Sequence, residues 1–229
     1  MALDLTTFVS DDDYRARVGS NDSGQDSLLE GQIVGTIRVL ERSLGLAPGM
    51  FKSGTETLTF DGPRRELADG SVVGCSRLWL RDSSGMGYLL QSVTASGVKL
   101  DTEQDGTFDG ETYDPATADT WLAPGPANAA TGGEPYRYLD ILTHRTDRDR
   151  GAWPTLPRSI RVTGTWGWAT TPELVADLVV HRTHEIREGL KGGAAGELPS
   201  FDGGIPMRPQ TAWMWREVEA RYGRHQWSF

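Results

Sequence analysis

Hydrophobic residues recur at a helical period in the N-terminal part of the chain. The clearest stripe consists of apolar residues three or four positions apart, which are Leu29, Ile33, Ile37, Leu40 and Leu44. This spacing predicts an amphipathic helix over residues 27–44, ended by Gly45, because glycine readily takes the left-handed conformation that terminates helices. A shorter helix is expected over residues 10–18, where Ser10 can act as the cap and the aspartates that follow suit its positive end.

A second helical pattern begins near residue 171. Thr171 is placed to cap it, Pro172 to be its first residue and Glu173 to be its early acid. Its apolar positions are Leu174, Leu178, Val179 and Ile186. We expect a helix over residues 171–188, stopped by the glycines from Gly189 onward, then a Gly- and Pro-rich linker over 192–209. A last helix over 210–222 and a tail over 224–229 complete the chain.

Between these helical segments the pattern changes to short alternating runs rich in threonine, valine and glycine. Candidate strands are 55–60, 77–80, 89–94, 97–100, 136–143 and 159–166. No helical crossover lies between them, so the pairing should be antiparallel. The sequence therefore predicts an α+β fold: a helical core, made of the N-terminal helix and two C-terminal helices, with an inserted antiparallel β-rich section.

The expected parts form one composite domain. They are the N-terminal helical part (1–50), the inserted β-rich section (51–168), the core helix (169–191), the linker (192–209), and the C-terminal helix and tail (210–229). The helices over 27–44 and 171–188 have apolar stripes of similar length, and each stripe needs a partner. We expect them to pack together.

Composition narrows the classes of protein that fit. The 229 residues carry a net charge of -9, and the lysines are Lys52, Lys99 and Lys191 only, which argues against a surface built to hold nucleic-acid phosphates. No apolar run approaches the roughly 20 residues needed to span a bilayer. The N-terminus lacks the features of a signal peptide, and Cys75 is the only cysteine. We expect a soluble, intracellular protein.

Residues 101–109 resemble a calcium-binding loop, because acids alternate and Gly106 occupies the sixth place. The twelfth place is Thr112 instead of a bidentate glutamate, and no helix pair flanks the loop. Asp101, Asp105 and Asp109 are thus weak metal candidates, and we expect all of them to be solvent-exposed without a metal.

His181 and His184, with Glu185 beside them, lie at a spacing that could share a metal ion on a helix. A third ligand at a known spacing is missing, so a partly exposed helix face is the preferred interpretation. Cys75 sits among apolar residues and is expected to be a buried structural thiol. No phosphate-binding loop, dinucleotide-binding motif or nucleophile elbow occurs, so we expect neither an enzyme nor a bound cofactor.

The most distinctive segment is IRVTGTWGW over residues 160–168, followed by TPELVAD over 171–177. It reads as a strand that passes through a Gly-aromatic corner into a proline-initiated helix. This segment resembles the signature of the head-tail connector (adaptor) proteins of long-tailed bacteriophages, whose strand has the form I-x-V-x-G-x-x-G. The resemblance covers about a third of the chain and includes the helix over 27–44. The long middle section and the Trp-rich C-terminus depart from simpler members.

The resemblance implies a structural virion protein. Such proteins form a ring, usually dodecameric, beneath the portal protein at the head-tail interface. The ring extends the DNA channel and docks the next connector, stopper or tail protein. DNA passes through without specific binding, and we expect an acidic lumen that repels it. The protein would be made in the host bacterial cytoplasm, with no role for a membrane.

The C-terminal segment is the expected partner-binding arm, most directly for the portal. Its candidate residues are the aromatic and arginine side chains that dominate binding hot spots: Trp213, Trp215, Arg221, Tyr222, Arg224, Trp227 and Phe229. One of Trp213 and Trp215 can face the core while the other faces outward. The alternative places Trp213 and Trp227 against the same subunit.

Other classes of function stay open. One is a β-rich carbohydrate- or calcium-binding module, which for carbohydrate would place several aromatic residues on one sheet face. Another is a calcium- or zinc-dependent enzyme, which elemental analysis of the purified protein would detect.

Overall fold

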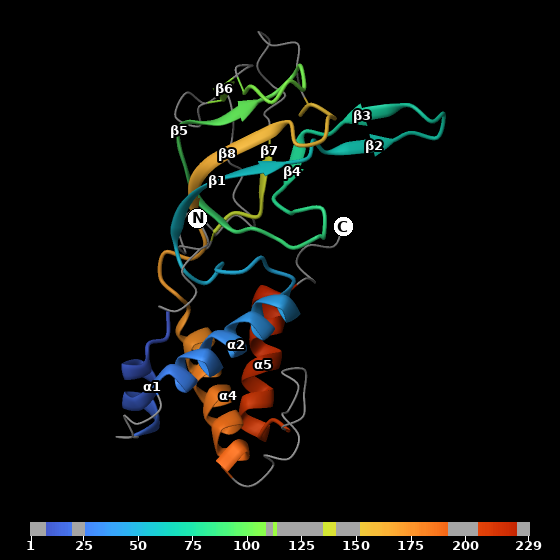
Figure 1. Cartoon of the computed structure of the whole chain (residues 1–229). Helices are drawn as coiled ribbons and strands as arrows, with labels where there is room; N and C mark the ends of the chain where they lie inside the picture. Colours follow the sequence, from blue (N-terminus) through green and yellow to red (C-terminus); the bar gives the residue numbers. More distant parts are fainter. Residues whose placement is uncertain are drawn as a thin grey trace. The chain divides into compact units, whose positions relative to one another are not determined.

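The computed structural model describes residues 8–19, 26–108, 112–113, 135–140, 152–191 and 206–223. It contains α-helices and antiparallel sheets, so the mixed α+β class expected from the sequence is confirmed (Figure 1). The chain forms two compact units. The helical unit consists of Ala2–Lys52 and Thr170–Phe229, and the β unit is Ser53–Ala169.

The helical unit contains α1 (Asp11–Val18), α2 (Asp26–Leu44), α4 (Glu173–Lys191) and α5 (Pro209–Tyr222), with α2, α4 and α5 side by side (Figure 1). The predicted stripe of α2 lies in the core, and each of its five apolar residues is at most 1% exposed. Burial of such a stripe is the main source of stability for a helix in a folded protein. Between α2 and α4, the Thr183 hydroxyl donates to Thr36 Oγ1 at 3.2 Å.

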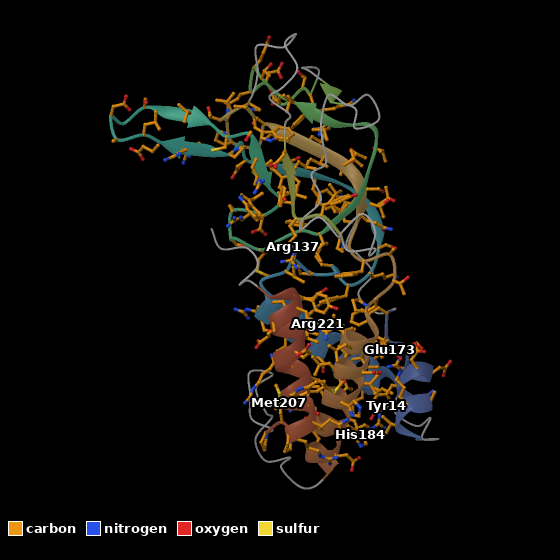
Figure 2. The ribbon with its side chains drawn as sticks, turned by 180° about the vertical axis from the view of Figure 1, so that it is seen from behind. Tyr14, Arg137, Glu173, His184, Met207 and Arg221 are labelled. Carbon is orange, nitrogen blue, oxygen red and sulfur yellow. The ribbon has the colours of Figure 1, made fainter. Side chains whose placement is uncertain are left out.

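Helix α1 is capped as the sequence predicts. Ser10 Oγ accepts from the Asp13 amide at 3.0 Å, and the Asp13 carboxylate accepts from the Ser10 amide at 3.0 Å. The Ser10 hydroxyl also donates to the Asp13 carboxylate at 2.7 Å, and this bond, with the one from the Ser10 amide, lowers the pKa of Asp13. Tyr14 is buried, and its hydroxyl lies 3.2 Å from His184 Nδ1. Figure 2 labels both residues, Tyr14 on α1 and His184 on α4. An ion pair between Arg17 and Asp177 further joins α1 to α4.

The start of α4 differs from the sequence prediction. The helix begins at Glu173, and the carbonyl of Pro172 accepts from the Ala176 amide, so Pro172 precedes the helix instead of opening it. The Thr171 hydroxyl donates to the Phe51 carbonyl at 2.6 Å, and so it ties two distant parts of the helical unit together. At the other end α4 continues through Gly189 to Lys191. A glycine inside a helix costs only about 1 kcal/mol, which the packing of this long helix offsets.

The main sheet of the β unit has the strand order β1-β8-β5-β6, and every pair is antiparallel. Its strands are β1 (Gly54–Phe60), β8 (Ile160–Trp166), β5 (Leu90–Leu100) and β6 (Thr112–Tyr113). Strand β8 alternates strictly, with Ile160, Val162, Gly164 and Trp166 buried. Trp166 packs against Phe60 and Tyr88 with ring centroids 5.8 and 6.1 Å away. The alternating pattern therefore separates an apolar face from a polar one.

Two of the predicted strands are one strand. The predicted strands 89–94 and 97–100 correspond to β5, which begins at Leu90 and whose largest break in pairing with β8 lies between Val93 and Val98. Gly97 sits at this irregularity, where a Cβ would lie 2.4 Å from the Thr163 carbonyl oxygen. Only glycine allows so close an approach of two backbones, and this explains why the sequence signal breaks there.

Two smaller pairs complete the β unit. Strand β4 (Arg77–Trp79) pairs with β7 (Tyr138–Asp140), within the predicted ranges 77–80 and 136–143, of which residues 141–143 lie outside the described part. Strands β2 (Arg64–Glu66) and β3 (Val72–Gly74) form a hairpin that the sequence pattern did not predict. All three residues of β2 are exposed, so it lacks the apolar alternation that marks a strand.

Candidate functional site

Helix α5 carries the part of the predicted partner-binding arm that the structure describes. Thr211, Met214 and Val218 form its buried face. Trp213 lies on the other side and is 60% exposed, which is unusual for so large an apolar side chain. The idea that Trp213 tucks back into its own subunit is therefore wrong, because this indole faces solvent.

The neighbouring candidates are already engaged to different degrees. Trp215 is half-buried, and its Nε1 donates to Glu219 Oε1 at 2.9 Å. Arg221 is exposed and donates to Glu217 at 2.7 Å, a bond that raises the pKa of its guanidinium. Tyr222 is half-buried and meets Phe51 edge-on, with ring centroids 6.3 Å apart. Arg224, Trp227 and Phe229 lie outside the described residues.

Glu185 fixes the position at which α5 begins. Its Oε1 accepts from the Thr211 hydroxyl at 2.6 Å and from the Arg208 amide at 3.0 Å, and its Oε2 lies 3.2 Å from Arg182 Nη1. Both charged side chains of this ion pair are buried. A buried carboxylate with three donors is strongly held, so α4 presents α5, and with it Trp213, in a fixed orientation. One feature of the sequence could have revealed this role of Glu185: it is a charged residue within the apolar stripe of α4.

The histidines of the pair on α4 lie in different surroundings. His184 is engaged with Tyr14, His181 is exposed, and Glu185 is occupied as described above. Within the described ranges, no group of three or more His, Cys, Asp or Glu side chains is placed to hold a metal ion.

A buried carboxylate that the sequence analysis missed lies at the end of α2. Glu41 is 1% exposed, and its Oε1 accepts from the Gly49 amide at 2.8 Å while Oε2 has no hydrogen-bond partner. Burial raises the pKa of Glu41 to about 7, although the amides of residues 49–51 and the charge of Arg38 oppose the shift. The group therefore holds the loop after α2 and titrates near neutral pH.

The acidic loop differs from the prediction at Asp101. This residue is buried, and its carboxylate accepts from the backbone amides of Gln104 at 2.7 Å and Gly106 at 3.0 Å. Desolvation is offset because the loop folds its own donors around the acid. Asp105 is exposed as expected, and its bonds from Thr107 lower its pKa. Asp109 lies outside the described residues.

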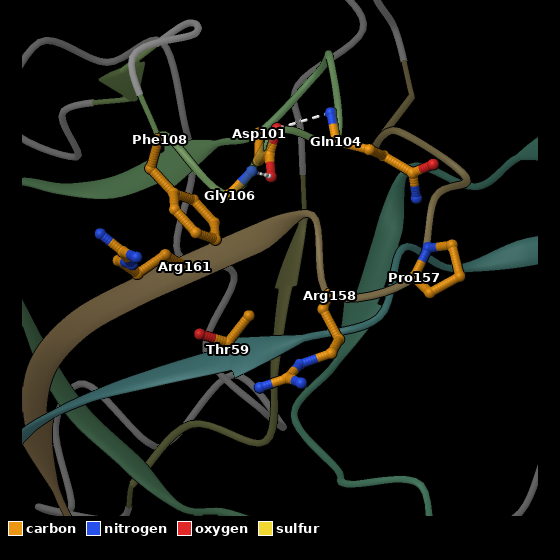
Figure 3. A pocket seen from close by; sticks show the side chains of 8 residues that line it. All are labelled: Thr59, Asp101, Gln104, Gly106, Phe108, Pro157, Arg158 and Arg161. Carbon is orange, nitrogen blue, oxygen red and sulfur yellow. Dashed lines mark hydrogen bonds between the residues drawn. The ribbon is translucent and has the colours of Figure 1, made fainter.

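Beside this loop the β unit has a hollow of about 530 Å³ (Figure 3). It is lined by Thr59, Asp101, Gln104, Gly106, Phe108, Pro157, Arg158 and Arg161. Arg161 comes from β8, and its guanidinium carbon lies 3.6 Å from the centroid of the Phe108 ring. No pattern in the sequence brings these residues together, since their placement depends on strand register.

The single cysteine is more open than expected. Cys75 is a free, half-exposed thiol directly after β3, where its amide donates to the Pro63 carbonyl and its carbonyl accepts from Trp153. The prediction of a buried thiol is wrong, because the hairpin base holds this residue through its backbone.

The segment that carries the family resemblance forms a strand, a corner and a helix. Strand β8 ends at Trp166, and Gly167 turns the chain with a φ of 85°. The Gly167 amide donates to the Leu89 carbonyl at 2.6 Å, and Trp168 is buried. Glycine suits this left-handed position, so the Gly-aromatic pattern has a clear structural cause.

No family model matches the chain, and no curated protein matches it either. Of the helices in the described part of the chain, none combines the length and apolar character needed to cross a membrane.

Proposed function

We propose that the chain is a subunit of a head-tail connector ring of a long-tailed bacteriophage. The observation that carries the proposal is the segment over 160–177, in which an alternating strand, a Gly-aromatic corner and the helix α4 follow one another. In this proposal the helices form the subunit core and the β unit is its insertion. The ring, dodecameric as the resemblance implies, lies beneath the portal in the virion.

The exposed Trp213 supports an assembly role. A tryptophan held on a rigid helix offers a large contact area at low entropic cost, which is what a binding hot spot requires. Glu185 supplies the rigidity, since it bonds both the Arg208 amide and the Thr211 hydroxyl at the start of α5. In our proposal Trp213 inserts into the portal, and the tail with Arg224, Trp227 and Phe229 extends the same contact.

The polar face of the sheet favours this function over a carbohydrate-binding module. In β1 and β8 the side chains on that face are threonines and Arg161, whereas Trp166 of β8 is buried on the opposite face. Sugar binding usually relies on exposed aromatic rings, because their apolar faces stack on the sugar. A portal contact through α5 needs no such platform.

Electron microscopy of the purified chain, alone and mixed with the portal protein encoded by the same phage, tests the proposal. We expect closed rings in the mixture, together with co-sedimentation of chain and portal. A Trp213→Ser variant should remain folded and lose the co-sedimentation, whereas the control Val73→Ser, which alters an exposed apolar residue of the β2–β3 hairpin, should keep it. A chain that stays monomeric with the portal at micromolar concentration excludes the connector function.

A further inference from the structure

The polar face of the main sheet gathers positive charge at one end. Thr59 of β1 and Lys99 of β5 are both cross-strand partners of Arg161 on β8. Directly opposed side chains have Cβ atoms about 5 Å apart, and like charges in such pairs are destabilising. Lys99 and Arg161 thus form an unfavourable pair that a bound anion would turn into a favourable one.

A third cation joins them from the turn before β8. Figure 3 shows the side chains of Arg158 and Arg161 on two sides of Thr59. Among the described residues, no carboxylate forms an ion pair with Lys99, Arg158 or Arg161.

The backbone around the hollow is held in uncommon conformations. The described non-glycine residues with positive φ are Gln104, at 60°, and Arg158, at 52°, and both line this hollow. Each is fixed by a carboxylate: Gln104 donates its amide to Asp101, and Arg158 donates its amide to Asp61 at 2.9 Å. Strain of this kind persists where the surrounding structure enforces it, and it often marks functional sites.

The described acids near the hollow are hydrogen-bonded within their own loop and form no ion pair with the arginines. Asp101 accepts from two backbone amides, and Asp105 accepts from the amide and hydroxyl of Thr107. Phe108 packs on the face of the Arg161 guanidinium, and this orients the group. The N–H donors of a guanidinium lie in its plane, so they stay available to a ligand.

We propose that this hollow binds a phosphate dianion, either free or as the terminal group of a small phosphate ester. Arg158 and Arg161 line the hollow and supply most of the charge, and the Thr59 hydroxyl donates between them. Lys99 stands opposite Arg161 on the neighbouring strand and adds to the positive potential. This charge suits a compact dianion better than a carboxylate, which carries a single charge. A nucleic-acid backbone would need a stripe of cations to follow its repeating monoanions, and the sheet has threonines there instead.

The test is calorimetric titration of the full chain with inorganic phosphate at pH 8, where the dianion dominates, with sodium acetate and sodium chloride at equal ionic strength as references. We expect saturable binding of phosphate, with the melting temperature raised by phosphate and not by the references. Phenyl phosphate in a parallel titration distinguishes the two possible ligands. If it binds more tightly than inorganic phosphate, the ligand is a phosphate ester; if it binds more weakly, the ligand is free phosphate.

Arg158→Gly is the decisive variant, because glycine accepts the positive φ without strain and the fold should keep its stability. We expect it to weaken phosphate binding about tenfold, the loss typical of one charge-assisted hydrogen bond. Arg161→Gln should weaken it similarly, and Lys99→Gln should weaken it less, because Lys99 opposes Arg161 without lining the hollow. Arg65→Gln on the exposed strand β2 should leave it unchanged. Equal affinity in Arg158→Gly and the unmodified chain overturns the proposal. Tighter, steeply salt-dependent binding of a DNA duplex at the same residues also overturns it, in favour of a nucleic-acid site.

Discussion

The two units of the protein handle buried polar groups in opposite ways. Among the described residues, the helical unit buries Glu41, Arg182, Glu185 and Arg187, whereas in the β unit Asp101 is the buried charged residue. The β unit relies on aromatic packing around Trp166 and leaves Lys99 and Arg161 on the polar face of its main sheet. The helical unit should therefore respond to changes of charge, and the β unit to changes of volume.

Trp166→Ala should have the largest effect, because it removes a fully buried indole that two aromatic rings contact. We expect a loss of about 4 kcal/mol in the free energy of unfolding, measured by urea denaturation. Hydrogen exchange should place the loss in the β unit. The matched control is Trp213→Ala on α5, which should change stability by less than about 0.5 kcal/mol. Equal losses of unfolding free energy in the two variants would contradict the view that the β unit depends more strongly on its buried aromatic packing than the helical unit depends on Trp213.

Glu185→Ala should destabilise the helical unit by about 3 kcal/mol, because it leaves the buried Arg182 guanidinium and the Thr211 hydroxyl without this acceptor. Urea denaturation measures the loss, and hydrogen exchange should show α5 opening first. Glu188→Ala, at an exposed position of the same helix, serves as the control. A loss below about 1 kcal/mol in the free energy of unfolding would mean that the buried ion pair of Glu185 does little to stabilise the helical unit.

Glu41 makes the stability of the helical unit depend on pH. Its pKa is raised from 4.5 to about 7 in the folded state, so its stabilising contribution is complete below pH 4.5 and is lost as pH rises through 7. We expect the unmodified chain to lose about 2 kcal/mol relative to Glu41→Gln between pH 5 and pH 8. Parallel urea denaturation of both chains measures this difference, and a constant difference across the range contradicts it.

Ser10→Ala should have the smallest effect, about 1 kcal/mol, since it removes the capping bonds of α1. Faster amide exchange in residues 11–14 would report the fraying of this helix. Ser83→Ala, at an exposed position of the β unit, provides the reference. Unchanged exchange in α1 would show that Tyr14 and Arg17 alone hold the helix.

The helices could be predicted because their hydrogen bonds are local and their apolar stripes repeat within one segment. Thr171 shows the limit: it has the sequence of a cap, yet a carbonyl 120 residues away takes its hydroxyl. Alternation predicted β1, β8 and, as two pieces, β5 of the main sheet, but it predicted neither the short strand β6 nor the register of the strands. The β2–β3 hairpin was missed because Arg64, Arg65 and Glu66 carry no apolar signal.

The same limit applies to the candidate sites. Trp213 and Trp215 could be selected by residue type, and their spacing predicts that they face different sides of the helix. The hollow beside Arg161 depends on the register that sets Thr59 of β1 opposite Arg161 of β8. Alternation along β8 shows that Arg161 faces outward, but no local pattern shows which side chains stand beside it.

The pairing of Gly54 with Trp166 has a consequence for the architecture of the chain. The β unit begins and ends at neighbouring positions of one sheet, where paired Cα atoms are about 5 Å apart. In the helical unit, the bond from the Thr171 hydroxyl to the Phe51 carbonyl holds together the two chain segments that lead into and out of the β unit. The β unit is therefore an insertion that can be exchanged. A short turn between residues 52 and 170, or a different domain, could replace it without changing the contacts among the helices.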